Sequence, residues 1–108
     1  MAVPEVSKVS EITVSDLRNY LRIAEASEDE NALLRSALSV AKEYIKSYTG
    51  MNDEQMDAHA DLIIVVYVLC SDMFDNRAYY VDKSNVNKIV ESILNLHSIN
   101  LLPTKEIT

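Results

Sequence analysis

The hydrophobic residues between positions 33 and 48 recur every three or four residues, which is the spacing of one face of an α-helix. This pattern predicts a long amphipathic helix over residues 27–50. Its apolar positions form one wide stripe: Leu33, Leu34, Ala37, Leu38, Ala41, Tyr44, Ile45 and Tyr48.

Both ends of this helix are marked in the sequence. Ser27 and Glu30 match the Ser-x-x-Glu capping box, in which each side chain accepts a hydrogen bond from the other residue's backbone N–H. Glu28 and Asp29 add negative charge to the first turn, where free backbone amides favour it. Gly50 is placed to adopt the left-handed conformation that commonly ends a helix. The boundaries of this helix are therefore predicted from local chemistry alone.

A shorter helix is predicted before it, over residues 13–23. Thr13 can act as its N-cap, with Asp16 three residues later in a variant of the capping box. Val14, Leu17 and Leu21 then follow at helical spacing. The acidic segment between the two helices breaks the apolar pattern, and we predict that it is a loop.

The third hydrophobic segment is the most apolar part of the chain. It begins at Asn52 or Asp53, either of which can cap a helix, contains the apolar run Leu62–Cys70, and continues to Phe74. The run is rich in β-branched residues and by itself is compatible with a buried strand. Its flanks, without Gly or Pro over roughly twenty residues, favour a helix instead. We therefore predict one continuous helix, the most buried of the fold because it is apolar nearly all round.

A fourth helix is predicted after a polar loop, with Asp82 or Ser84 as its N-cap. The apolar pattern fades over residues 97–100, and Pro103 prevents easy continuation of the helix. The stripe of this helix consists of Val86, Ile89, Val90, Ile93 and Leu94.

These segments predict an all-α fold, a small four-helix domain with a long central apolar helix. One Gly and two Pro are too few for the tight turns of a β-sandwich or barrel. Residues 1–11 lack periodicity and are predicted to be a flexible N-terminal arm, 12–102 the helical domain, and 103–108 a C-terminal tail. A chain of 108 residues buries a modest core, which favours association with other chains.

The charge of the chain excludes some functions. It carries 17 acidic and 10 basic residues, and the basic ones are scattered, so a groove that binds a nucleic-acid backbone is not expected. Cys70, the single cysteine, excludes an internal disulfide and a cysteine-based zinc site, and we predict that it is a buried small hydrophobe.

The start has no signal-peptide core, and no apolar run reaches the ~20 residues of a membrane helix. A cytoplasmic protein without membrane contact is expected.

Catalytic or metal-binding chemistry is not expected either. Glu54, Asp57, His59 and Asp61 lie close together in sequence, but on a helix His59 points away from Asp57, and the Glu-x-x-His pattern of a bundle metal site is absent. We interpret these acids as complementing the helix dipole. His97 stands alone near a helix end, and one glycine cannot form a phosphate loop. The sequence thus predicts no enzyme, no metal and no cofactor.

One loop contains candidate contacts for a partner. Tyr79 and Tyr80 are adjacent aromatic residues that follow Asn76 and Arg77, and exposed Tyr and Arg are typical anchors of protein interfaces. The other interpretation, that one tyrosine packs under the loop while the other is solvated, stays equally open.

The order of these segments resembles that of the small head–tail connector proteins, also called head-completion or adaptor proteins, of long-tailed bacteriophages. Residues 12–23 resemble the opening helix of the family, which ends in a Leu-Arg-Ile phrase before an acidic loop. Residues 29–50 are similar to its second helix, which ends in Tyr-Thr-Gly. Residues 61–80 resemble its long apolar helix and the Asn-Arg turn, and residues 85–102 its C-terminal part in phages of Gram-positive bacteria.

The resemblance implies a structural phage or prophage protein without catalysis or cofactor. Its subunits would form a homo-oligomeric ring beneath the portal protein, with twelve-fold symmetry in the virion, and would offer a platform to the next tail-completion protein. DNA would pass through the ring without specific binding. The protein would assemble in the host cytoplasm and reside in the virion neck.

Two sets of residues are candidates for these contacts. The candidate partner contacts are Asn76, Arg77, Tyr79, Tyr80, Leu101 and Leu102. Acidic residues that face a channel would repel DNA and keep it from sticking. The candidate channel-facing acids are Glu25, Glu28, Asp29, Glu30, Asp53, Glu54 and Asp57.

A different class of function fits the same residues. A small helical adaptor or regulatory protein that binds a single protein partner would need the same capped helices and no active site. A stable monomer that binds its partner one to one would favour this alternative over a ring.

Overall fold

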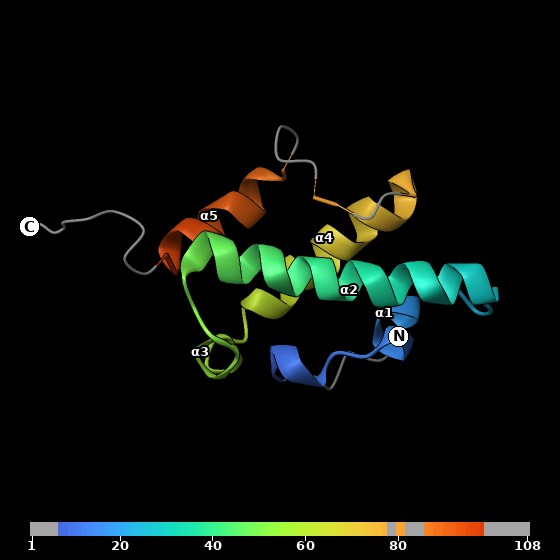
Figure 1. Cartoon of the computed structure of the whole chain (residues 1–108), viewed down its shortest axis with the longest axis horizontal. Coiled ribbons are helices and arrows are strands. Elements are labelled where there is room, and N and C mark those ends of the chain that lie inside the picture. The colour runs from blue at the N-terminus through green and yellow to red at the C-terminus, as the bar shows by residue number, and fades with distance from the viewer. Residues whose placement is uncertain (1–6, 78–79, 82–85, 99–108) are drawn as a thin grey trace, which may run out of the picture.

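The structure is a computed structural model that describes residues 7–77, 80–81 and 86–98. This part of the chain is helical and contains no strand, so the predicted all-α class is confirmed (Figure 1). Its elements are the 3₁₀ turn η1 (Val9–Glu11) and the helices α1 (Val14–Leu21), α2 (Glu28–Thr49), α3 (Asp53–Asp57), α4 (Leu62–Asn76) and α5 (Lys88–Leu96).

The two capping boxes predicted from sequence are confirmed. At the start of α2, the Glu30 N–H donates to Ser27 Oγ and the Ser27 N–H donates to Glu30 Oε1, both at 3.1 Å. Thr13 and Asp16 make the equivalent pair at the start of α1. Gly50 ends α2 with φ 79°, the left-handed conformation that costs glycine no steric strain.

The third predicted helix is broken, and the prediction of one continuous helix is wrong. Residues 58–61 form a turn between α3 and α4 that is closed by i→i+3 hydrogen bonds, such as His59 N–H to Met56 O and Leu62 N–H to His59 O, both 3.1 Å. Met56 and Leu62 are both buried, yet on one straight helix they would point ~120° apart. The break lets both side chains enter the same core.

The fourth helix begins later than predicted. Asn87 is the N-cap of α5, because its Oδ1 accepts a hydrogen bond of 2.7 Å from the Ile89 N–H. Val86 therefore precedes the helix, and the predicted caps Asp82 and Ser84 lie outside the described residues. The C-cap residue is His97, within the segment where the apolar pattern fades.

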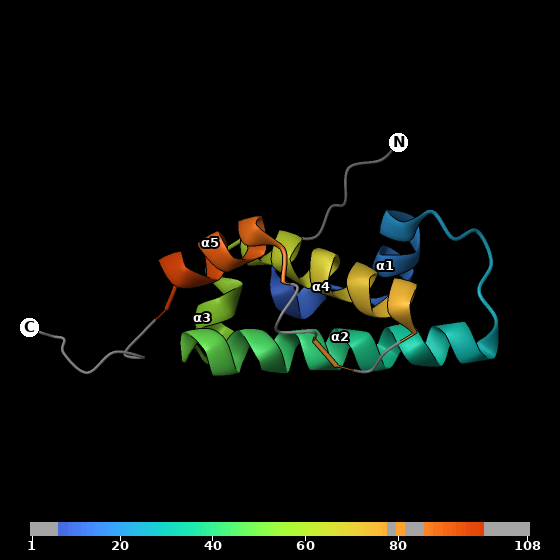
Figure 2. The same ribbon diagram turned by 90° about the horizontal axis from the view of Figure 1, so that it is seen from above.

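Helix α4 is the centre of the core, as its composition predicts. It packs against α2, α5 and α1, and Figure 2 shows α2 along one side of the molecule with the other helices on the opposite side. Eight of its residues are buried: Leu62, Ile63, Val65, Val66, Tyr67, Leu69, Cys70 and Met73. Within the apolar run Leu62–Cys70, Ile64 is exposed, with 53% of its surface accessible, and Val68 is half-buried.

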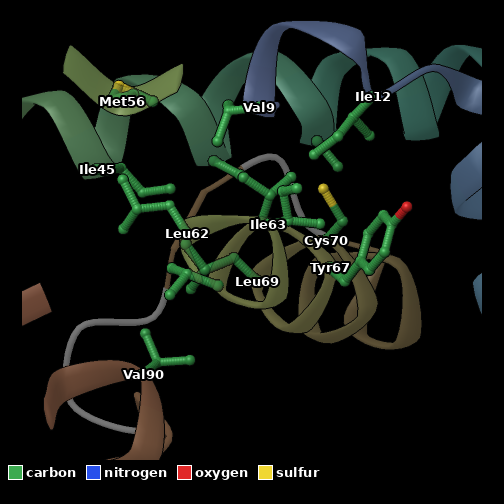
Figure 3. Close-up of a cluster of buried hydrophobic side chains, with 14 of the residues drawn as sticks. Val9, Ile12, Ile45, Met56, Leu62, Ile63, Tyr67, Leu69, Cys70 and Val90 are labelled. Atoms are coloured by element: carbon green, nitrogen blue, oxygen red, sulfur yellow. The ribbon is translucent and has the colours of Figure 1, made fainter. Parts of the chain in front are cut away.

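The core also includes residues of the predicted arm. Val9 in η1 and Ile12 just after it are buried, and both point toward α4 (Figure 3). Ser10 connects η1 to α3, because its N–H and Oγ donate to the two carboxylate oxygens of Asp57 at 2.9 and 2.7 Å. Within residues 7–11, Val9 and Ser10 therefore contact the helical domain. Residues 1–6 lie outside the described part, and the division of the chain into arm, domain and tail stays a prediction.

The thiol of Cys70 is expected to react very slowly in the folded protein. The residue is fully buried, and burial raises the pKa of the thiol from 9.0 to about 12 because the thiolate is poorly solvated. At pH 8 the thiolate fraction is then about 1,000-fold lower than for an ordinary cysteine. Labelling with a chromogenic disulfide reagent, with and without denaturant, measures this. Rapid labelling without denaturant would contradict the buried position.

Candidate assembly surfaces

The turn after α4 holds the described members of the predicted partner contacts. Arg77 ends the helix in the left-handed conformation, with φ 53°. Its guanidinium lies 3.4 Å from Glu30 Oε2 and 4.4 Å from the centre of the Phe74 ring. Asn76 Nδ2 donates to the Asp72 carbonyl at 2.9 Å. The Arg77–Glu30 contact connects the end of α4 to the start of α2, while 58% of the Arg77 side chain stays exposed.

A shallow, open depression lies beside this turn. Asp29, Glu30, Leu33 and Arg77 line a depression of about 270 Å³. Tyr80 is 66% exposed, so it is free to contact a partner. Tyr79, Leu101 and Leu102, also predicted as partner contacts, lie outside the described residues. The turn therefore offers an arginine and a tyrosine at one corner of the molecule, which are typical interface residues.

Helix α5 presents an apolar face that the sequence analysis missed. Val90 and Leu94 are buried, but Ile89 is 66% and Leu96 76% exposed. The exposed pair is seven residues apart, with half-buried Ile93 between them, so the three share one side of the helix. The signal in the sequence was the spacing of these three residues, which are four and three positions apart. It is hard to recognise because Ile89 and Ile93 also fit the core-facing stripe of the same helix. Exposed aliphatic residues aligned in this way are typical of contact surfaces.

The seven candidate channel acids form two groups rather than one. Glu25, Glu28, Asp29 and Glu30 lie at or just before the start of α2, whereas Asp53, Glu54 and Asp57 belong to α3, beyond its other end (Figure 1). The 22 residues of α2 separate the groups by roughly 33 Å, at 1.5 Å per residue. The molecule therefore has an acidic region at each end of its longest helix.

Three of these acids also have internal partners. Glu30 caps α2 and contacts Arg77. Asp53 Oδ1 lies 2.9 Å from Lys46 Nζ, and this hydrogen bond raises the pKa of Lys46. The hydrogen bonds from Ser10 lower the pKa of Asp57, because they stabilise its charged form. All three carboxylates thus have a partner within the subunit that fixes their position.

The structure brings together two histidines that the sequence analysis treated as isolated. His97 Nε2 lies 2.8 Å from Asp61 Oδ2, and the rings of His59 and His97 are 4.3 Å apart between their centres. His59 and Asp61 belong to the turn between α3 and α4, and His97 caps α5. Asp57 belongs to α3 and lies before the break, so it is on a different element from His59 and Asp61.

The described residues therefore form a small helical domain, and its candidate contact residues lie on the surface. The chain belongs to the family of phage gp6-like head-tail connector proteins, whose family model matches residues 11–100. This confirms the resemblance stated above for residues 12–102. No curated protein and no solved structure matches the chain. The family is structural and non-enzymatic, and its members take part in joining the phage head to the tail.

No helix in the described part of the chain is long and apolar enough to cross a membrane.

Proposed function

We propose that this chain forms a ring of identical subunits beneath the portal of a phage, with the portal's twelve-fold symmetry. The ring joins head to tail and extends the DNA channel, and it carries out no catalysis. The observation that carries the proposal is the family membership over residues 11–100. One face of the ring binds the portal and the other binds the next tail-completion protein. The ring assembles in the host cytoplasm and takes its place in the virion neck.

The internal construction of the subunit supports a structural role. Capping boxes fix the starts of α1, α2 and α3, and a continuous core joins η1, α2, α4 and α5. A ring subunit has to present the same surfaces in every copy, and a uniquely packed core provides this.

The exposed face of α5 supports contact between copies. We propose that Ile89 and Leu96 pack against a neighbouring subunit, because two aliphatic side chains exposed on one helix face are best covered in a repeated assembly. Arg77 and Tyr80, which follow the end of α4, are proposed contacts for the portal or the tail protein, together with Asn76. Tyr79, Leu101 and Leu102 remain proposed contacts as well.

The charge of the chain supports a channel that DNA passes without binding. The net charge is −7, and acidic residues on the wall of a channel repel the phosphate backbone. Because the acids form groups at the two ends of α2, a subunit with α2 along the channel axis places both groups on the wall. A subunit with α2 pointing outward from the axis places only one group there. We propose that at least one group faces the lumen.

Molar mass by light scattering over a wide concentration range, with negative-stain images, tests the ring. Closed rings of about 146 kDa are expected, for twelve chains of 12.2 kDa each. A reconstruction of the ring then identifies which end of α2 faces the lumen, and one with all seven acids on the outer wall would refute the channel proposal. A protein that stays monomeric and does not form a ring on isolated portal would contradict the ring proposal.

The adaptor function is distinguished by the same measurements. The exposed face of α5 also suits a single partner helix, which would cover Ile89 and Leu96 in place of a second copy. A monomer at every concentration that forms a one-to-one complex with one host protein would favour this function.

A further inference from the structure

We propose that His59, Asp61 and His97 form a binding site for a divalent transition-metal ion, with Zn²⁺ as the preferred ion. The site joins the turn between α3 and α4 to the end of α5. The sequence analysis predicts no metal because a helix would point His59 away from Asp57 and because His97 stands alone in the sequence. In the structure the helix is broken at residues 58–61 and α5 packs against α4, and together these bring the three side chains close to one another.

The arrangement of the donor atoms fits a metal ion. One ligand atom from each of the three residues lies within 4.8 Å of the other two. Zn–N and Zn–O bonds of about 2.0–2.2 Å place tetrahedral ligand atoms roughly 3.3–3.6 Å apart. His97 Nε2 and Asp61 Oδ2 are 2.8 Å apart, so this pair has to open by less than about 1 Å. Small side-chain rotations are enough, and the helices need not move.

The ligand types select the class of metal. Two imidazoles and one carboxylate form a set typical of zinc and related first-row metals, whereas magnesium and calcium prefer oxygen ligands alone. The His97 side chain is 13% exposed and that of Asp61 41% exposed. The carboxylate therefore borders solvent, which leaves room for water as the fourth ligand. The backbone around His59 is held by two i→i+3 hydrogen bonds, so this ligand is already positioned.

The site has a structural consequence for the assembly surface. α5 carries the exposed face with Ile89 and Leu96, and His97 immediately follows Leu96. Near the same end, Tyr48 Oη donates a hydrogen bond to Asn95 Oδ1. Without metal, the contact of His97 Nε2 with Asp61 Oδ2 is a second connection at this end. A bound metal replaces this contact with coordination bonds from His97, Asp61 and His59. Bound metal thus holds the α5 face in one orientation relative to the core.

Calorimetric titration of the metal-free full chain with Zn²⁺ tests the site. One Zn²⁺ per chain is expected, with a rise in Tm of at least about 5 °C at saturating metal, because the ion binds only the folded state. Titration with Co²⁺ is expected to give the visible absorption bands of tetrahedral cobalt. The bands report tetrahedral coordination, which Co²⁺ bound to a pair of surface carboxylates would not show.

Variants assign the binding to the three residues. The chain has two histidines, so His59→Ala and His97→Gln are each expected to weaken Zn²⁺ binding by more than about 100-fold. Asp61→Asn is expected to weaken it as well, whereas Glu54→Gln, a change at an exposed carboxylate of α3, leaves it unchanged. Circular dichroism of the metal-free variants checks that they remain folded.

Two results would overturn the proposal. The first is a wild-type chain that binds no Zn²⁺ and gives no tetrahedral Co²⁺ bands, which would identify the cluster as a hydrogen-bonded His–Asp pair only. The second is binding that persists unchanged in folded His59→Ala protein, which would place the metal elsewhere.

Discussion

Replacing Ile63 with Ala is expected to lower the free energy of unfolding by about 2–5 kcal/mol. Ile63 is buried where α4 meets η1, close to Val9 (Figure 3), so the shorter side chain loses apolar burial and leaves a cavity. A domain of this size is stable by about 5–15 kcal/mol, so the loss is a large fraction of the total. Urea unfolding followed by circular dichroism measures it.

The next residue provides a matched control. Ile64→Ala removes the same atoms from the same helix, but Ile64 is 53% exposed, so the expected change is within about 0.5 kcal/mol. Alanine also has the higher helix propensity, which offsets part of any lost contact. Equal losses for the two variants would contradict the orientation of α4, because the faces of the helix would then not differ in burial.

The double substitution Ile89→Asp with Leu96→Lys is expected to abolish ring formation and leave a folded monomer. Burying two aliphatic side chains contributes about 3–6 kcal/mol to each proposed contact between subunits, so its loss weakens association by about 100-fold or more. The new charges suit the ends of α5, an acid in the first turn and a base in the last, so the helix itself is retained. Light scattering and negative-stain images of the variant measure the outcome.

The control for this variant introduces the same charges elsewhere. Ser39→Asp with Ser47→Lys changes two exposed positions of α2 and keeps the net charge of the chain, as the α5 variant does. Rings are expected to persist in it. Rings that survive the α5 substitutions would show that this face does not join subunits, and the exposed stripe would then be available to another partner.

The chemistry of single segments determined much of the fold. Ser27 with Glu30, Thr13 with Asp16, and Gly50 act through hydrogen bonds or backbone conformation within a few residues, so their roles could be predicted from neighbouring letters. The burial of α4 could be predicted because nearly every residue in its central run is apolar. Family membership, too, follows from the sequence, through the match over residues 11–100.

Other features were decided only by tertiary packing. The break after Asp57 has no Gly or Pro to mark it, and it follows from the need to bury Met56 and Leu62 in one core. Asp61 and His97 are 36 positions apart and meet because α5 packs on α4. Ile89 is exposed because the neighbours of α5 cover only one side of it. Local hydrogen bonds and apolar spacing are determined by residues that are close in sequence. The contacts named here depend instead on how whole helices pack into a shared core.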